Sequence, residues 1–134
     1  MMRPGPNHIG QYSERNSVLN SIPADHVIIV CGRTDMRLGI DGLASIVQQS
    51  FKLDPCCRSL FLFCGRKTDR IKALFYEGDG FLLLYKRLEG GRFQWPRRRS
   101  EARMITRQQL RWLLEGLSVD QPKALVSVGS KIMV

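Results

Sequence analysis

The chain has 134 residues, and its 43% hydrophobic and 25% charged content is typical of one globular domain, which excludes a chain that is disordered throughout. It has no run of about 18 apolar residues, which excludes a membrane-spanning helix. Its charge is less ordinary, because 21 Lys and Arg against 12 Asp and Glu give a net charge of +9. This excess favours a polyanionic partner, namely DNA, RNA or an acidic membrane surface, although a basic protein without such a partner has the same composition.

The N-terminal segment, 1–25, has three prolines and little apolar periodicity, so it is predicted to be a flexible leader that lacks the apolar core of a signal peptide. A single α+β domain is expected over 26–119, followed by a tail at 120–134. The four cysteines form no C-x-x-C pair and only two histidines accompany them, so the sequence predicts no metal site and no cofactor. Three of the cysteines lie in or beside apolar runs, which indicates reduced, packed thiols and a cytoplasmic protein.

Two strands and a helix are predicted in the first half of the domain. The β-branched, apolar run at 27–31 predicts a strand. Between 34 and 51, apolar residues recur every three or four positions, which predicts a helix that begins near Asp41. A second apolar strand is expected at 59–64.

The second half contains the strongest hairpin pattern of the chain. Two apolar, aromatic-containing runs at 70–76 and 81–88 flank a loop rich in glycine and acidic residues at 77–80. The aromatic residues at 93–95 predict one more short strand.

A last helix is predicted from its N-terminal signals. Thr106 is an expected N-cap, Gln109 three residues later completes a capping box, and Gly116 marks the end. The tail at 122–134 is apolar enough for a strand or a docked arm. The order of strand, helix, sequential strands and helix predicts an α+β fold, with a small antiparallel sheet of four to five strands and two helices packed on one face.

Most of the excess charge lies in one stretch, 86–111, which has nine Lys and Arg against two Glu and therefore a net charge of +7. Arginine predominates there, and its planar guanidinium group matches phosphate oxygens in pairs. The run 97–99 after Pro96 is typical of a flexible basic arm, and Trp95 is placed to stack on bases. The alternatives are a solvated charge run that keeps the protein soluble and a membrane-binding surface. The predicted nucleic-acid-binding residues are Arg70, Lys72, Lys86, Arg87, Arg92, Trp95, Arg97, Arg98, Arg99, Arg103, Arg107 and Arg111.

A second basic cluster at 66–72 opens the hairpin, where it either extends the first cluster or forms an ordinary exposed loop. The acidic residues give a weaker pattern for chemistry. Asp35 and Asp41 are expected to accept backbone amide protons near a helix start, and the other candidate carboxylates have turn or pairing roles. No spacing among them requires a metal ion, so no catalytic residue is predicted.

Four motifs in series resemble one known family. They are residues 31–44, which are similar to CG-x-TDMR-x-G-[FI]-DGLA; 69–81, similar to DRIK followed by DGDGF; 85–96, similar to YKRLE-x-GRF-x-WP; and 109–116, similar to QL-x-x-LLEG. On these motifs the chain is identified as a member of the TnpB accessory proteins of IS66-type bacterial insertion sequences. This family is distinct from the RNA-guided nucleases that share the name TnpB.

The resemblance implies a non-catalytic accessory protein that is encoded beside a transposase and required for efficient DNA transposition. It implies a bacterial, nucleoid-associated protein whose partners are DNA at the element ends and the transposase of the same element. The motif residues Thr34, Asp35, Arg37 and Asp41 are predicted to bind a partner protein.

Three hypotheses remain open on the sequence. The first is a DNA-binding accessory factor that uses the basic stretch. The second is a protein-interaction module that docks on the transposase. The third is a Mg²⁺-dependent nuclease that uses Asp69, Glu77 or Asp79. The sequence does not determine the oligomeric state.

Overall fold

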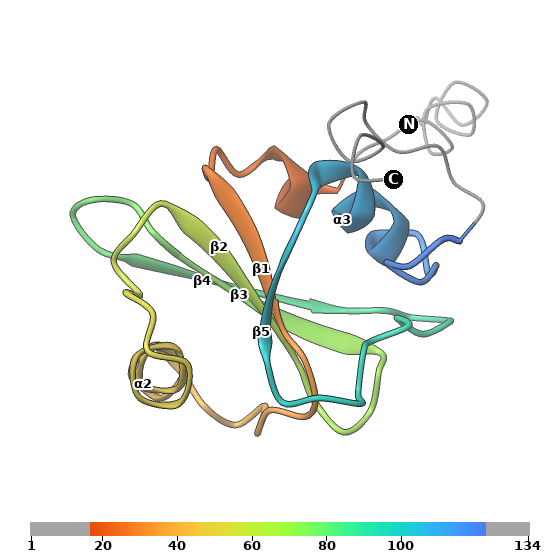
Figure 1. Cartoon of the computed structure of the whole chain (residues 1–134), viewed down its shortest axis with the longest axis horizontal. Helices are drawn as coiled ribbons and strands as arrows, with labels where there is room; N and C mark the ends of the chain where they lie inside the picture. Colours follow the sequence, from red (N-terminus) through yellow and green to blue (C-terminus); the bar gives the residue numbers. More distant parts are fainter. Residues whose placement is uncertain (1–16, 123–134) are drawn as a thin grey trace, which may run out of the picture.

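The computed structural model describes residues 17–122. One five-stranded sheet forms the centre of the molecule, and short helices flank it (Figure 1). The elements in chain order are the 3₁₀ helix η1 (Val18–Ser21), β1 (His26–Val30), α2 (Ile40–Ser45), its π-helical continuation η2 (Ile46–Ser50), β2 (Ser59–Cys64), β3 (Arg70–Tyr76), β4 (Phe81–Arg87), β5 (Ala102–Ile105) and α3 (Arg107–Leu114).

The strands lie in the order β4-β3-β2-β1-β5. β1 and β2 are parallel because α2 and η2 carry the chain back to the end of the sheet at which β1 begins. The other three pairs are antiparallel. The predicted α+β class with five strands and two helices is confirmed, but the sheet is mixed, whereas the prediction had it antiparallel.

The two helices pack on opposite faces of the sheet, and not on one face as predicted (Figure 1). β2 is buried along its whole length: Leu60 and Leu62 face the α3 side, while Phe61 and Phe63 face the α2 side. A central strand that is apolar on both faces needs cover on both, and one helix on each side supplies it.

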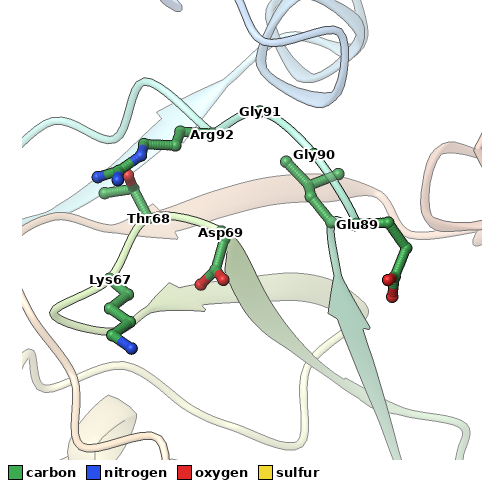
Figure 2. Close-up of a pocket in the computed structure, with 8 residues that line it drawn as sticks. Lys67, Thr68, Asp69, Glu89, Gly90, Gly91 and Arg92 are labelled. Carbon is green, nitrogen blue, oxygen red and sulfur yellow. The ribbon is translucent and has the colours of Figure 1, made fainter.

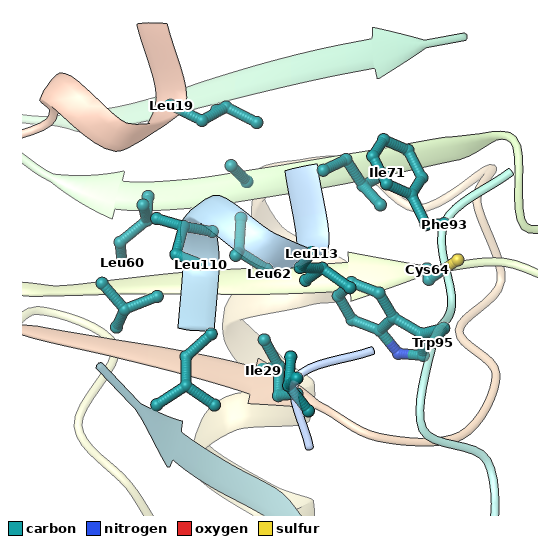
Figure 3. Close-up of a cluster of buried hydrophobic side chains, with 14 of the residues drawn as sticks. Leu19, Ile29, Leu60, Leu62, Cys64, Ile71, Phe93, Trp95, Leu110 and Leu113 are labelled. Carbon is teal, nitrogen blue, oxygen red and sulfur yellow. The ribbon is translucent and has the colours of Figure 1, made fainter. Parts of the chain in front are cut away.

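The α3 face holds the larger apolar cluster, in which Leu110 and Leu113 of the helix contact β1, β2 and β3 (Figure 3). The predicted capping box is confirmed. Thr106 accepts a hydrogen bond from the backbone N–H of Gln109, whose side chain accepts one from the N–H of Thr106. The chain leaves the helix at Gly116, whose φ of +88° favours glycine.

The β3–β4 hairpin is confirmed around the loop 77–80, with Tyr76 opposite Phe81. The predicted strand at 93–95 is wrong. Phe93 and Trp95 lie in an extended loop, and they are buried because their side chains pack into the α3-side cluster. The fifth strand is β5, which follows this loop and pairs with β1.

The structured part of the chain begins before the predicted domain boundary at residue 26. Leu19 of η1 is buried in the α3-side cluster, so 17–25 packs on the domain although it was assigned to the leader. At the other end, Val119 is buried and Asp120 forms an ion pair with Arg103. The strand or arm predicted at 122–134 lies, apart from its first residue, outside the described residues. In 17–122, each helix is too short to cross a bilayer.

Candidate nucleic-acid interface

The strand register brings three separate loops to one end of the sheet. Val30, the last residue of β1, lies opposite Phe63 near the end of β2 and opposite Ala102 at the start of β5. Arg70 at the start of β3 lies opposite Arg87 at the end of β4. The residues that follow or precede these positions therefore meet at the same end. We call this surface, formed by 31–39, 65–70 and 86–101, the basic end.

The basic end has eleven cationic side chains and four carboxylates, hence a net charge of +7. The predicted stretch 86–111 supplies only part of this charge, because the turn after β1 and the β2–β3 loop add to it. The expectation that the second cluster extends the first agrees with this placement. The eleven cations are Arg33, Arg37, Arg66, Lys67, Arg70, Lys86, Arg87, Arg92, Arg97, Arg98 and Arg99.

Each carboxylate of the basic end has an arginine neighbour in the sequence as its partner. The N–O distances are 2.9 Å for Arg37–Asp35, 2.9 Å for Arg70–Asp69, 3.6 Å for Arg87–Glu89 and 3.8 Å for Arg99–Glu101. The hydrogen bonds from Arg37 lower the pKa of Asp35 to about 2. The hydrogen bond from Arg70 likewise lowers the pKa of Asp69. The four ion pairs together neutralise four of the eleven cations.

Arg97 holds the three loops together. Its guanidinium group donates to the carbonyl oxygens of Gly32 (2.8 Å), Gly65 and Arg66 (3.3 Å). The N–H of Gly32 also donates a hydrogen bond to the carbonyl oxygen of Pro96, in the same loop as Arg97, at 2.9 Å. The run 97–99 is therefore docked on the end of the sheet and is not the flexible arm that was predicted. Arg97 serves the structure of the loops, and its donors are directed away from solvent.

Gly65 allows the first two loops to approach each other. A Cβ atom at this position would lie 2.4 Å from Cγ of Met36, so any larger residue would force the Met36 side chain out of its place against β2. The same contact is supported by the hydrogen bond from the N–H of Thr34 to the carbonyl of Cys64, at 2.9 Å. The loop geometry of the basic end is thus fixed by packing as well as by Arg97.

Trp95 was predicted to stack on bases, but its side chain is only 5% exposed. Its indole N–H donates to the carbonyl oxygen of Val30 at 3.0 Å, and the ring packs in the α3-side cluster (Figure 3). An aromatic ring between polar residues in the sequence was interpreted as a surface ring, whereas the loop turns it inward. Trp95 anchors the basic loop and presents no face to a ligand.

Two further predicted binding residues have structural partners outside the three loops of the basic end. Arg107 donates to the carbonyl oxygens of Asn20, Ile22 and Ala24 and so fixes the segment before β1. Arg103 forms a two-pronged ion pair with Asp120. Both guanidinium groups therefore act inside the protein.

Two predicted binding residues, Lys72 and Arg111, lie outside the loops of the basic end. Lys72 donates from Nζ to the carbonyl oxygen of Leu38 at 2.8 Å, and the same Nζ lies 5.7 Å from the centre of the Tyr85 ring. Arg111 is exposed on α3. Neither belongs to the loops of the basic end.

Six cations of the basic end have no side-chain hydrogen bond or ion pair within residues 17–122. Five of them, namely Arg33, Arg66, Lys67, Arg92 and Arg98, are exposed loop residues, and Lys86 lies near the end of β4. The sequence did not single out Arg33, because it stands alone between a strand and a helix. The six are Arg33, Arg66, Lys67, Lys86, Arg92 and Arg98.

Two open hollows lie between these side chains. One, of about 540 Å³, is lined by Lys67 to Asp69 on one side and by the 88–92 loop on the other. Figure 2 shows Arg92 reaching from that loop toward Thr68, while Glu89 points away on the other side. The second, of about 550 Å³, lies among Gly32, Arg33, Arg66 and Arg97. Both hollows are open to solvent, as suits an extended polyanion better than a small enclosed ligand.

The predicted partner-binding motif also lies near this end. Asp35 accepts from the N–H of Arg37 and from its guanidinium group, and the Arg37 side chain is 91% exposed. Thr34 is buried, so it positions the turn but presents no surface. Asp41 is in the first turn of α2, but within residues 17–122 no backbone N–H donates to its carboxylate as was expected. Asp35 accepts an amide proton of its own turn and none of the helix.

The carboxylates considered for a nuclease are not brought together. Asp69 precedes β3, while Glu77 and Asp79 follow it, so the seven-residue strand separates them by about 20 Å. In the part of the chain that the structure describes, no three His, Cys, Asp or Glu side chains gather at distances suited to a metal ion. Burial raises the pKa of the Cys64 thiol to about 11, so this cysteine is a protonated core residue.

The fold and the charge define a class of protein, namely a small α+β module that presents a rigid, cationic loop surface. Comparison with known proteins gives the family: the model of the IS66 Orf2-like proteins matches residues 25–124, and the chain belongs to this family. The resemblance of the four motifs is thereby confirmed. The family is associated with an accessory role in the transposition of insertion sequences and is generally non-catalytic.

Two relatives come from Sinorhizobium fredii (strain NBRC 101917 / NGR234). The uncharacterized protein y4hO is 41% identical over 97 residues, which are 72% of this chain and 84% of the relative. The uncharacterized protein y4jC is 29% identical over 91 residues, which are 68% of this chain and 78% of the relative. No solved structure matches the chain.

Proposed function

We propose that the protein binds DNA through the basic end as an accessory factor in transposition of its insertion sequence. The observation that carries the proposal is the gathering of six uncommitted cations from three loops on one rigid surface. Four of the six are arginines, which contact phosphate oxygens in pairs. A surface that is already ordered binds a polyanion without the entropic cost of ordering its loops.

Binding of this kind has a defined salt dependence. Each neutralised phosphate releases condensed counterions, so contacts from six side chains give a log–log slope of about −5 against salt concentration on duplex DNA. The proposal is tested by filter binding of the full chain to duplex DNA from the element ends and to a scrambled duplex. A slope near zero, or no binding at low salt, contradicts it.

A pair of single variants tests which surface is used. Arg92→Gln removes one charge from the basic end, and Lys52→Asn removes one from the opposite end of the sheet. Lys52 has a φ of +58°, and asparagine tolerates that conformation. We expect Arg92→Gln to make the slope shallower by about 0.9 and Lys52→Asn to leave it unchanged. Equal effects of the two variants would mean that net charge alone, and no particular surface, attracts the DNA.

A second candidate function is docking on the transposase, and it is favoured by the Asp35–Arg37 turn. Asp35 holds the highly exposed Arg37 side chain in one orientation, as suits recognition of a carboxylate on a partner protein. A pull-down of the transposase after nuclease treatment tests this function. Binding that is lost in Arg37→Ala but retained in Arg92→Gln favours it, and no association at any salt concentration contradicts it.

A further inference from the structure

The two edges of the sheet differ in how they are protected. β5 has only four residues, and Arg103 in its centre is tied to Asp120. β4 is longer, at seven residues, and its first five residues, FLLLY, include no charge and no proline. Its pairing with β3 runs from Arg70–Arg87 to Tyr76–Phe81 without a bulge. Proteins usually blunt an edge of this length with charges, proline or a bulge, because it otherwise pairs with another strand.

The hairpin loop determines which backbone groups of β4 face outward. The N–H of Glu77 donates to the carbonyl of Gly80 at 2.8 Å, which makes these two residues a hydrogen-bonded pair. Because such pairs alternate along an antiparallel ladder, Leu82 and Leu84 bond to β3. Phe81, Leu83 and Tyr85 then direct their N–H and C=O groups away from the sheet. Within residues 17–122, no loop or helix provides partners for them.

The side chains of β4 leave this edge accessible. Phe81 and Leu83 lean on the α2-side cluster, and Leu84 leans on the α3-side cluster, each only partly buried. Tyr85 is 53% exposed and lies near the Lys72 ammonium group, at 5.7 Å. The edge is therefore apolar on both sides of its backbone.

We propose that β4 pairs antiparallel with β4 of a second copy of this chain, centred on Leu84, to form a continuous ten-stranded sheet. In this register all seven residues overlap, and the outward-facing residues bond to each other, Leu83 with Tyr85 and Phe81 with Arg87. Leu82 lies opposite Lys86 on the α3 side. No two like charges are opposed within the strand pair, and apolar residues meet at its centre, where Leu84 lies opposite Leu84 and Leu83 opposite Tyr85.

Charge complementarity supports a second copy as the occupant. The antiparallel arrangement places Lys86 and Arg87 of one copy next to the hairpin loop of the other, which carries Glu77 and Asp79. Glu89 of the first copy also lies near this loop, so residues 86–89 bring a net charge of +1 to a loop with a net charge of −2. The pairing is therefore attractive at both ends of the strand at once. It also leaves the two basic ends at opposite ends of the joint sheet. If the proposed DNA binding holds, the dimer can bind two duplexes. This consequence rests on the proposed function, but the dimer itself does not depend on it.

The test is sedimentation velocity of the full chain over a concentration series, with two substitutions of one residue. Leu82→Lys places a lysine opposite Lys86 of the other copy twice in the dimer, and Leu82→Glu places a glutamate there. Both variants lose the same apolar side chain, so any cost to folding is shared. We expect Leu82→Lys to raise the dimer dissociation constant at least about tenfold relative to Leu82→Glu.

Tyr85→Pro removes one outward-facing N–H and leaves the bonds between β3 and β4 in place, because proline is tolerated on an edge strand. We expect this variant to be monomeric with an unchanged circular dichroism spectrum. An unmodified chain that is monomeric at every concentration, or a dimer that ignores the sign of the charge at position 82, overturns the proposal. Filter binding to DNA separates the two proposals, since a monomer that retains the salt slope refutes only the dimer, and a dimer without DNA binding refutes only the proposed function.

Discussion

The two ends of the sheet carry opposite charge although the same strands form both. The basic end has a net charge of +7. At the other end, the loops 22–25, 51–58 and 77–80 hold two cations and four carboxylates, a net charge of −2. The loops and the strand ends beside them, Arg70, Lys86 and Arg87, create this difference in charge, because the rest of the strands is mostly apolar. A chain whose charge served only solubility would not need to segregate it, whereas the proposed DNA binding would use the segregation to orient the approach of the polyanion.

The largest effect is expected from Trp95→Ala, which tests whether the loop of the basic end depends on the core. Loss of the buried ring and of its hydrogen bond to Val30 should lower the free energy of unfolding by about 3–5 kcal/mol. Urea denaturation followed by circular dichroism measures this. A variant as stable as the parent protein would mean that the ring is not part of the core.

Arg97 and Arg98 are adjacent but are expected to act differently. Arg97→Ala loses the bonds to three carbonyl oxygens and should destabilise the fold by about 2–3 kcal/mol. Arg98→Ala should change stability by less than about 0.5 kcal/mol. In DNA binding the second variant should make the salt slope shallower by about 0.9. Denaturation and filter binding of the two proteins check this division, and a similar loss of stability in both would contradict it.

A smaller effect is expected from removal of one acid at each end. Glu101→Gln releases Arg99 from its ion pair, so it should make the salt slope of DNA binding steeper by about 0.9. Asp25→Asn makes the same charge change at the opposite end, where it releases Arg58 from its ion pair, and should have no effect on the slope. If the two variants strengthen binding equally, the difference between the ends has no functional meaning.

The smallest effect concerns pH. The pKa of Asp35 is lowered to about 2 by Arg37, from an ordinary value of 3.8. Because the folded-state pKa is depressed, the ion pair stabilises the turn above pH 3.8, and this contribution is lost as the pH falls toward 2. We expect an NMR titration of the Asp35 carboxyl group to show the low pKa and Arg37→Gln to return it toward 3.8. A low pKa that persists in the variant would exclude Arg37 as its cause.

Local patterns predicted the elements well, because each one carries its own signals. The apolar runs of β1 and β2, the hairpin loop and the capping box of α3 are all properties of adjacent residues. β5 was missed because its four residues, ARMI, are too short and too polar to form a distinctive run. The arrangement was harder to predict, since the burial of β2 on both faces becomes evident only when its partners are known.

The charge of the candidate site was predictable, but the roles of individual arginines were not. Arg97 and Arg98 are adjacent arginines that the sequence does not distinguish. Only the fold places the carbonyl oxygens of Gly32 and Gly65 around Arg97. Conversely, Arg33 has no basic neighbours in the chain and reaches the basic end only through the sheet register. The sequence therefore showed where the basic residues are concentrated, but it did not show which of them stabilise the loops and which are free to bind a ligand.

The position of Trp95 makes it an intrinsic fluorescence probe of the loop at the basic end. The ring lies beneath the loop of the basic end and bonds to the last carbonyl of β1, while the other tryptophan, Trp112, is on α3. With Trp112 replaced by phenylalanine, intrinsic fluorescence would come from Trp95 alone. A red shift of its emission would then signal the loop leaving the sheet, and a constant emission maximum during titration with DNA would identify a surface that binds without rearranging.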